Sequence, residues 1–170
     1  MKRLHYVILA LLVIGLDAFT KMLILRNVRL HTAIPVIENF FQIVHVRNTG
    51  AAFGIGANSD SALVPLLLNG GAIIVFFIVV VYSLRTHISD RLLQTGLHLI
   101  LGGAVGNLID RFRWGSVVDF LDVYVTIGGR EHHWPAFNVA DSAICIGMAL
   151  LFIDMWRKPK EAARSEVSVQ

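Results

Sequence analysis

The chain has 170 residues, 55% of them hydrophobic and 16% charged, and its formal net charge is +3. Soluble domains carry about a quarter charged residues, and their apolar residues follow short periodic patterns, whereas the apolar residues here come in long blocks. This composition excludes an ordinary soluble domain and predicts an integral membrane protein, and the weak positive charge does not indicate a nucleic-acid partner.

Four blocks are long enough to cross a bilayer as helices, because the hydrocarbon layer takes about 20 mainly apolar residues. They are Leu4–Leu25, Ala62–Leu84, Leu92–Ile109 and Val139–Trp156. The first follows a basic tip like that of a signal peptide, but it is too long and contains Asp17 and Lys21, which indicates a retained helix. We expect residues 1–158 to form one integral membrane domain and the polar residues 159–170 to be a disordered tail.

The distribution of Lys and Arg predicts the orientation of these helices. Basic residues are dense at both termini and in the short turn Arg85–Arg91, and they are spread thinly over two longer connections, residues 26–61 and 112–138. Short segments rich in Lys and Arg stay in the cytoplasm. Both termini are therefore expected in the cytoplasm, and the two connections are expected on the outer side of the membrane.

Each outer connection contains a segment with its own pattern. Phe40–Val46 alternates apolar and polar residues and is followed by the turn residues 48–50, which predicts a short strand in a small sheet on the bilayer surface. Val117–Val125 is apolar enough to lie at the membrane interface, and Gly128 and Gly129 end it. The predicted fold is an all-α membrane protein with four transmembrane helices, a small extracytoplasmic β element and an interfacial segment.

Polar residues within the predicted helices gather at one depth. A helix rises about 1.5 Å per residue, which places Asp17 about 20 Å and Asn107 about 22 Å from the inner ends of their helices. Lys21 and Arg111 lie one turn further out, and Asp141 falls in the outermost turn of the last helix. Ionisable groups at such a boundary are costly to keep, so we interpret this level near the outer face as a functional site.

Structural roles explain part of this set without any function. Asp17 and Lys21 are four residues apart and would also form a simple intrahelical ion pair. Arg111 shares a helix face with Asn107, and its long side chain could instead extend to the membrane interface. The pattern leaves both readings open for these residues.

The carboxylates of the last third of the chain also allow more than one interpretation. Asn138, three residues before Asp141, resembles a helix N-cap with its first-turn acid, so capping and catalysis both remain open for Asp141. Asp119 and Asp122 would share a face in a helical turn, and their spacing does not choose between them. The stretch 131–133, Glu-His-His, lacks the spacing of a helical zinc motif and is expected to be a solvated loop without metal.

Five short blocks of sequence together carry a family resemblance. They are Leu16-Asp17-x-x-Thr20-Lys21, Asn48-Thr49-Gly50-Ala51-Ala52-Phe53-Gly54, Gly102-Gly103-Ala104-Val105-Gly106-Asn107-Leu108-Ile109-Asp110-Arg111, Val117-Val118-Asp119-Phe120 and Phe137-Asn138-Val139-Ala140-Asp141. In this order they resemble the signature blocks of the bacterial lipoprotein signal peptidase family, also called signal peptidase type II. The resemblance runs from the first predicted helix to the fourth, although Ala18 stands where the family usually has glutamine.

The resemblance implies an aspartic endopeptidase of the bacterial inner membrane that removes the signal peptide from diacylglyceryl-modified prolipoproteins, cutting before the lipidated cysteine. Its catalytic pair falls on Asp119 and Asp141, which decides against Asp122. The residues that it implies around this pair, for substrate binding or orientation, are Asn48, Asn107, Arg111, Asn138, Asp17 and Lys21. It also implies inhibition by globomycin-type cyclic peptides, and no cofactor or metal is expected.

Two other classes of protein would also account for buried polar residues. A small transporter or proton-coupled channel component places such groups near the midplane between repeats, whereas here they lie near one face and no internal repeat is visible. A non-catalytic assembly subunit, packed through Gly102, Gly103 and Gly106, leaves the carboxylates unexplained. Hydrolysis by two carboxyl groups, one protonated and one ionised, explains them.

Overall fold

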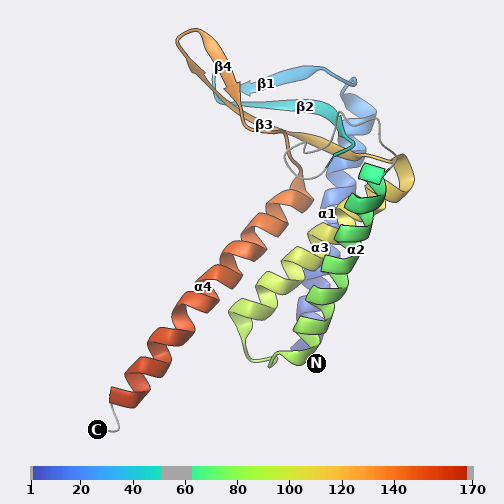
Figure 1. Ribbon diagram of the computed structural model, residues 1–170. Helices are drawn as coiled ribbons and strands as arrows, with labels where there is room; N and C mark the ends of the chain where they lie inside the picture. Colours follow the sequence, from blue (N-terminus) through green and yellow to red (C-terminus); the bar gives the residue numbers. More distant parts are fainter. Residues whose placement is uncertain (1, 51–62, 168–170) are drawn as a thin grey trace.

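The computed structural model describes residues 2–50 and 63–167. Within these ranges the helices are α1 (Lys2–Asn27), α2 (Leu63–Arg85), α3 (Arg91–Trp114) and α4 (Val139–Val167), and the strands are β1 (Ala33–Ile37), β2 (Phe41–Asn48), β3 (Val117–Ile127) and β4 (Arg130–His133). Figure 1 shows the strands as a sheet at one end of the helices, with the N-terminus at the opposite end. The helical membrane protein with a small β element is therefore confirmed.

Within the described residues, three helices are long and apolar enough to cross a membrane, over Arg3–Asn27, Arg91–Trp114 and Val139–Arg157. They match three of the four predicted spans. α2 has a shorter qualifying apolar stretch, Asn69–Arg85, so the fourth span stays a prediction. Large apolar side chains such as Leu12, Phe77 and Phe152 are exposed on the outer helix faces, as expected for helices surrounded by lipid.

α3 is the central helix, because α1, α2 and α4 all pack against it. Glycines of α3 serve this packing: a Cβ added at Gly102 would lie 2.8 Å from the backbone oxygen of Ala10, and one at Gly106 would lie 2.7 Å from Oδ2 of Asp17. Only glycine allows such close approach. The backbone of α4 is helical to Val167, past the predicted boundary at residue 158, and the single domain and disordered tail stay predictions.

The sheet is antiparallel with the order β1-β2-β3-β4. The strand predicted at Phe40–Val46 is confirmed as β2. The segment expected to lie at the membrane interface forms β3, because its valine-rich run suits a strand and has partners on both sides. Its place at the interface stays a prediction. Gly128 and Gly129, at φ 59° and 75°, form the turn to β4, so the stretch expected as a loop at 131–133 is an exposed strand.

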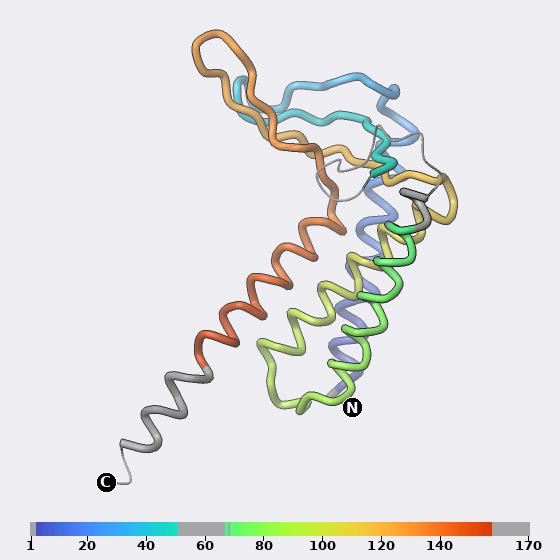
Figure 2. The backbone as a smooth tube through the Cα atoms, viewed as in Figure 1, coloured from blue at the N-terminus to red at the C-terminus, as the bar shows by residue number. Residues whose placement is uncertain are grey.

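Two connections fix the sheet to the helices, and Figure 2 traces both along the backbone. α3 ends at Gly115, which adopts a left-handed conformation (φ 68°), and the chain then enters β3. Val118 and Phe120 of β3 pack in a core with Ile24 and Val28 near the end of α1. On the other side, the Phe137 carbonyl accepts bonds from the backbone of residues 120 and 121 just before α4 begins. β3 and the start of α4 therefore lie side by side.

Candidate active site

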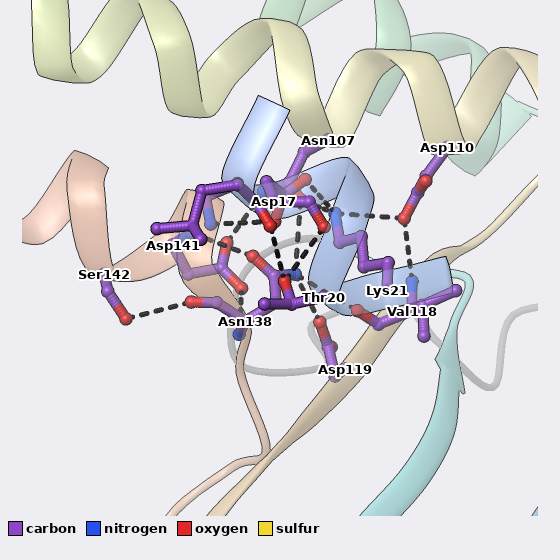
Figure 3. Close-up of polar contacts among 12 residues, drawn as sticks. Asp17, Thr20, Lys21, Asn107, Asp110, Val118, Asp119, Asn138, Asp141 and Ser142 are labelled. Carbon is purple, nitrogen blue, oxygen red and sulfur yellow. Dashed lines mark hydrogen bonds and ion pairs between the residues drawn. The ribbon is translucent and has the colours of Figure 1, made fainter. Parts of the chain in front are cut away.

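The residues predicted from the sequence meet where the helices reach the sheet. Figure 3 shows most of them together, namely Asp17, Lys21, Asn107, Asp119, Asn138 and Asp141. They come from different elements: Asp17 and Lys21 from α1, Asn48 from β2, Asn107 and Arg111 from α3, Asp119 from β3, and Asn138 and Asp141 from the start of α4. Several of these polar side chains are almost completely buried, including Asp17, Lys21, Asp119 and Asn138. Such burial requires partners, and the hydrogen bonds identify them.

The start of α4 is a capping box. The Asp141 N–H donates to Oδ1 of Asn138 at 2.9 Å, and the Asn138 N–H donates to Oδ2 of Asp141 at 3.2 Å. The predicted N-cap is therefore confirmed. The box uses only one polar atom of each side chain, so the Asn138 amide nitrogen and Oδ1 of Asp141 remain for contacts elsewhere.

Those remaining atoms join Asp141 to Asp119 through amide groups. Asn138 Nδ2 donates to Oδ1 of Asp119 at 2.7 Å, and Asn48 Nδ2 donates to Oδ2 of Asp119 at 3.0 Å. Asn107 Nδ2 donates to Oδ1 of Asp141 at 2.7 Å, and its own oxygen accepts from Asn138 Nδ2 at 3.2 Å. The two carboxyl groups thus lie on either side of Asn138, held by three asparagine side chains.

Lys21 lies at the centre of a second group of polar side chains, which does not contact the Asp119 carboxyl group directly. Its ammonium nitrogen is 2.8 Å from Oδ2 of Asp17, 3.0 Å from Oδ2 of Asp110 and 3.0 Å from Oδ1 of Asn107. The predicted pair of Asp17 and Lys21 is confirmed, but Lys21 also crosses to α3. Asp110 was missed as a site residue, although an acid three residues after Asn107 on the same helix was a signal for it.

This Lys21 cluster holds the backbone next to each aspartate. Oδ1 of Asp17 accepts from the Ala140 N–H at 3.0 Å, and Oδ2 of Asp110 accepts from the Val118 N–H at 3.1 Å. Ala140 directly precedes Asp141, and Val118 directly precedes Asp119. The cluster therefore positions both aspartates through the main chain.

Arg111 is half-buried, and it contacts the turn after β2. Its guanidinium donates to the Gly50 carbonyl at 3.2 Å, and the Gly50 N–H donates to Oδ1 of Asn48 at 2.9 Å. Arg111 thus supports the turn that presents Asn48 to Asp119. The rest of the predicted block, residues 51–54, lies outside the described residues.

Asp119 and Asp122, which spacing alone did not separate, point to opposite faces of β3. Residues an odd number apart in a strand lie on opposite faces. Asp119 faces Asn138 and Asn48, whereas Asp122 accepts from Nε2 of Gln42 at 2.6 Å on the other face. Only Asp119 can therefore pair with Asp141.

The surroundings of Asp119 favour its protonated form. Burial, followed by the nearby carboxyl of Asp141, raises the pKa of Asp119 to about 7, while the amides of Asn48 and Asn138 act in the opposite direction. One carboxyl group of the pair can thus carry a proton near neutral pH. A protonated and an ionised carboxyl side by side can act as general acid and general base on one substrate. Within the described residues, no group of side chains has the arrangement of a metal site.

Comparison with known sequences identifies a family and several relatives. A sequence model of the family described as signal peptidase (SPase) II matches residues 9–157. A relative from Syntrophotalea carbinolica, named lipoprotein signal peptidase, is 49% identical over 151 residues, covering 88% of this chain and 89% of that protein. A protein of the same name from Syntrophus aciditrophicus is 44% identical, covering 92% of this chain and 94% of that protein.

Two solved structures, each described as a bacterial membrane enzyme, have a similar fold. One superposes with a TM-score of 0.73 at 28% identity and covers 92% of this chain and 90% of its own. The other has a TM-score of 0.68 at 32% identity and covers 89% of this chain and 92% of its own.

Proposed function

The chain belongs to the signal peptidase II family, and from this premise we propose that it removes the signal peptide from diacylglyceryl-modified prolipoproteins, cutting before the lipidated cysteine. It is a protease of the membrane. Asp119 and Asp141 are its catalytic pair, which makes it an aspartic endopeptidase that requires no cofactor. The observation that carries this proposal is the position of Asn138, whose side chain binds Asp119 while its backbone binds Asp141.

The chemistry assigns a different role to each carboxyl group. Asp119, with its pKa raised to about 7, holds the proton and donates a hydrogen bond to the carbonyl oxygen of the scissile bond. Asp141 takes a proton from a water molecule, which attacks the carbonyl carbon. Asp119 then protonates the leaving nitrogen as the peptide bond breaks, and the proton taken by Asp141 restores the pair.

The surrounding residues orient this pair. Asn48, Asn107 and Asn138 hold the carboxyl groups through their side-chain amides, which leave the total charge unchanged. Asp17, Lys21 and Arg111 act further away, through the backbone beside the aspartates and the turn that carries Asn48.

We place the protein in the bacterial inner membrane with four transmembrane helices, both termini in the cytoplasm and the active site near the outer face. α2 is the additional span, because its 23 residues reach about 35 Å as a helix. The apolar side chains of Ile34, Val36 and Ile37 are about half exposed on β1, which suits a sheet edge that touches lipid. In this position the substrate's lipid chains remain in the bilayer while its scissile bond reaches Asp119.

Cleavage of a defined substrate tests the proposal. Purified protein in detergent is given a diacylglyceryl-modified prolipoprotein, and the products are followed on a gel. Asp119→Asn and Asp141→Asn should each reduce cleavage by at least about 10³-fold, because each keeps the shape of the side chain but removes proton transfer. Globomycin should inhibit the wild-type protein in competition with the lipidated substrate.

The matched control is Asp122→Asn, on the same strand and equally buried but on the opposite face. This variant should keep most of the activity. If Asp122→Asn is inactive while Asp119→Asn still cleaves, Asp119 does not belong to the catalytic pair and the proposed mechanism is wrong.

A further inference from the structure

Asp122 is a buried carboxylate that the catalytic pair does not use. It is 5% exposed and lies on the face of β3 opposite to Asp119. A carboxylate in such surroundings is costly unless it is paired, so its partners indicate what it does for the protein.

The partners of Asp122 join three strands. Gln42, directly opposite on β2, donates from Nε2 to Oδ2 at 2.6 Å. His133, the last residue of β4, places its Nδ1 2.9 Å from Oδ2 and 3.1 Å from Oδ1, and donates to this carboxylate. The His133 ring also stacks on Tyr124, with 5.1 Å between ring centroids. Asp122 thus connects β2 and β4 across β3.

His133 is also the residue from which the chain leaves the sheet towards the active site. Residues 134–137 separate it from Asn138, and they run along β3: the Trp134 N–H donates to the Val123 carbonyl at 2.8 Å, and the Phe137 N–H donates to the Leu121 carbonyl at 3.0 Å. The next residue is Asn138, which is completely buried between Asp119 and Asp141. One end of this connection is therefore fixed by His133 and the other ends in the active site.

We propose that Asp122 and His133 form a clamp that positions Asn138, and through it sets the relative placement of Asp119 and Asp141. This inference rests on the proposed catalytic role of the two aspartates. The clamp does not touch the reacting atoms, so both residues are positioning residues. When it is broken, the connection at residues 134–137 shifts, Asn138 moves away from Asp119, and the reacting groups are held less accurately.

The charges around His133 favour its protonated form, which donates to Asp122. Burial lowers the pKa of His133, but the hydrogen bond and charge of Asp122, followed by those of Glu131, raise it above its ordinary value of 6.5 on balance. Glu131 is exposed and lies 3.3 Å from the second ring nitrogen, so its contribution is screened by solvent. The buried partner, Asp122, is the one that fixes the ring.

The test compares four variants with the wild-type protein in the cleavage assay. Asp122→Ala removes the acceptor, and His133→Phe keeps a ring over Tyr124 but removes the donor, so the second variant still tests the clamp if the first fails to fold. Asp122→Asn keeps an oxygen that can accept from His133, and Glu131→Gln changes only the exposed partner.

Asp122→Ala and His133→Phe should each lower kcat about 10-fold or more with KM nearly unchanged, because a small misplacement of catalytic groups is costly. Asp122→Asn and Glu131→Gln should keep a kcat close to that of the wild type. A fifth variant, which combines Asp122→Ala with His133→Phe, should have a kcat little lower than either single variant, because both substitutions remove the same contact.

A pH profile separates positioning from simple loss of folded protein. The amide of Asn138 lowers the pKa of Asp119, so a displaced Asn138 should move the alkaline limb of the kcat profile to higher pH. The other ionisable groups that act on Asp119 are Asp141 of α4, Lys21 of α1 and Arg111 of α3, and the variants change none of them. If kcat is unchanged in Asp122→Ala and His133→Phe, or if it falls without a shift of the pH profile, the proposed clamp is wrong. Activity retained by Asp119→Asn and Asp141→Asn overturns the proposed function instead.

Discussion

Asp119→Asn is expected to destabilise the protein at pH 4 and to stabilise it at pH 8. Burial and the neighbouring Asp141 raise the pKa of Asp119 from 3.8 to about 7 in the folded protein. Between these values the folded state keeps a proton that the unfolded state has released, so the wild-type protein loses stability as the pH rises through this range. An amide is neutral at every pH and has no such loss.

Two opposing effects set the change in the free energy of unfolding of Asp119→Asn. The difference between 3.8 and about 7 corresponds to about 4 kcal/mol, at about 1.36 kcal/mol per pKa unit. Both oxygens of Asp119 accept from amide groups, of Asn48 at 3.0 Å and Asn138 at 2.7 Å, so the new amide leaves one buried donor without an acceptor. That costs about 1–3 kcal/mol. The variant should therefore be about 1–3 kcal/mol more stable than the wild type above pH 7, and less stable by a similar amount below pH 4.

Thermal unfolding in detergent at pH 4 and pH 8 measures both signs. For a chain of this size, 1 kcal/mol corresponds to about 2–4 °C in Tm, so shifts of roughly 5 °C in opposite directions are expected. Glu38→Gln removes an exposed carboxylate and serves as the control, which should follow the wild type at both pH values. If Asp119→Asn lowers Tm equally at both pH values, Asp119 does not hold a proton near neutral pH and cannot be the general acid.

Three further predictions concern the reaction and its place in the membrane. The rate should fall as the pH rises through about 7, where Asp119 loses its proton, and Asn48→Ala should move this limb to higher pH because the Asn48 amide lowers the pKa of Asp119. In a Cys145→Ala background, an impermeant thiol reagent applied to intact cells should label Thr126→Cys but not Ser89→Cys, and the reverse pattern would place the active site in the cytoplasm. A precursor whose acceptor cysteine is replaced by serine should be cleaved orders of magnitude more slowly, because the lipid anchor holds the scissile bond in position; comparable rates for both precursors would remove that role of the lipid.

The fixed rise per residue of a helix made most of the candidate site predictable from the sequence. It placed Asp17, Asn107 and Asp141 at one level, and the structure brings them together through Lys21 and Asn138. Asp110 also lies at this level, just beyond Asn107, but it was not among the site residues that the family resemblance implied.

The sheet was less predictable because its contacts depend on register. The run Val117–Val125 is apolar throughout, and such a run does not distinguish a buried strand from a segment at the interface. Spacing alone did not choose between Asp119 and Asp122. The family resemblance favoured Asp119, and the strand gives the physical reason, because it puts the two side chains on opposite faces. The pairing of Asp122 with His133 likewise requires the register of β3 and β4, which composition does not provide.

The Lys21 cluster explains how a site so rich in charge can keep one carboxyl group protonated. A lysine in direct contact with Asp119 would favour its ionised form and abolish the general acid. Lys21 contacts Asp17 and Asp110 instead, and these two carboxylates hold the N–H groups of Ala140 and Val118. The charge of Lys21 still lowers the pKa of Asp119, but by less than burial and Asp141 raise it, and the cluster positions both aspartates through the backbone. Because the cluster holds the neighbouring N–H groups and does not contact the Asp119 carboxyl group, both aspartates are fixed in position while the pKa of Asp119 stays raised.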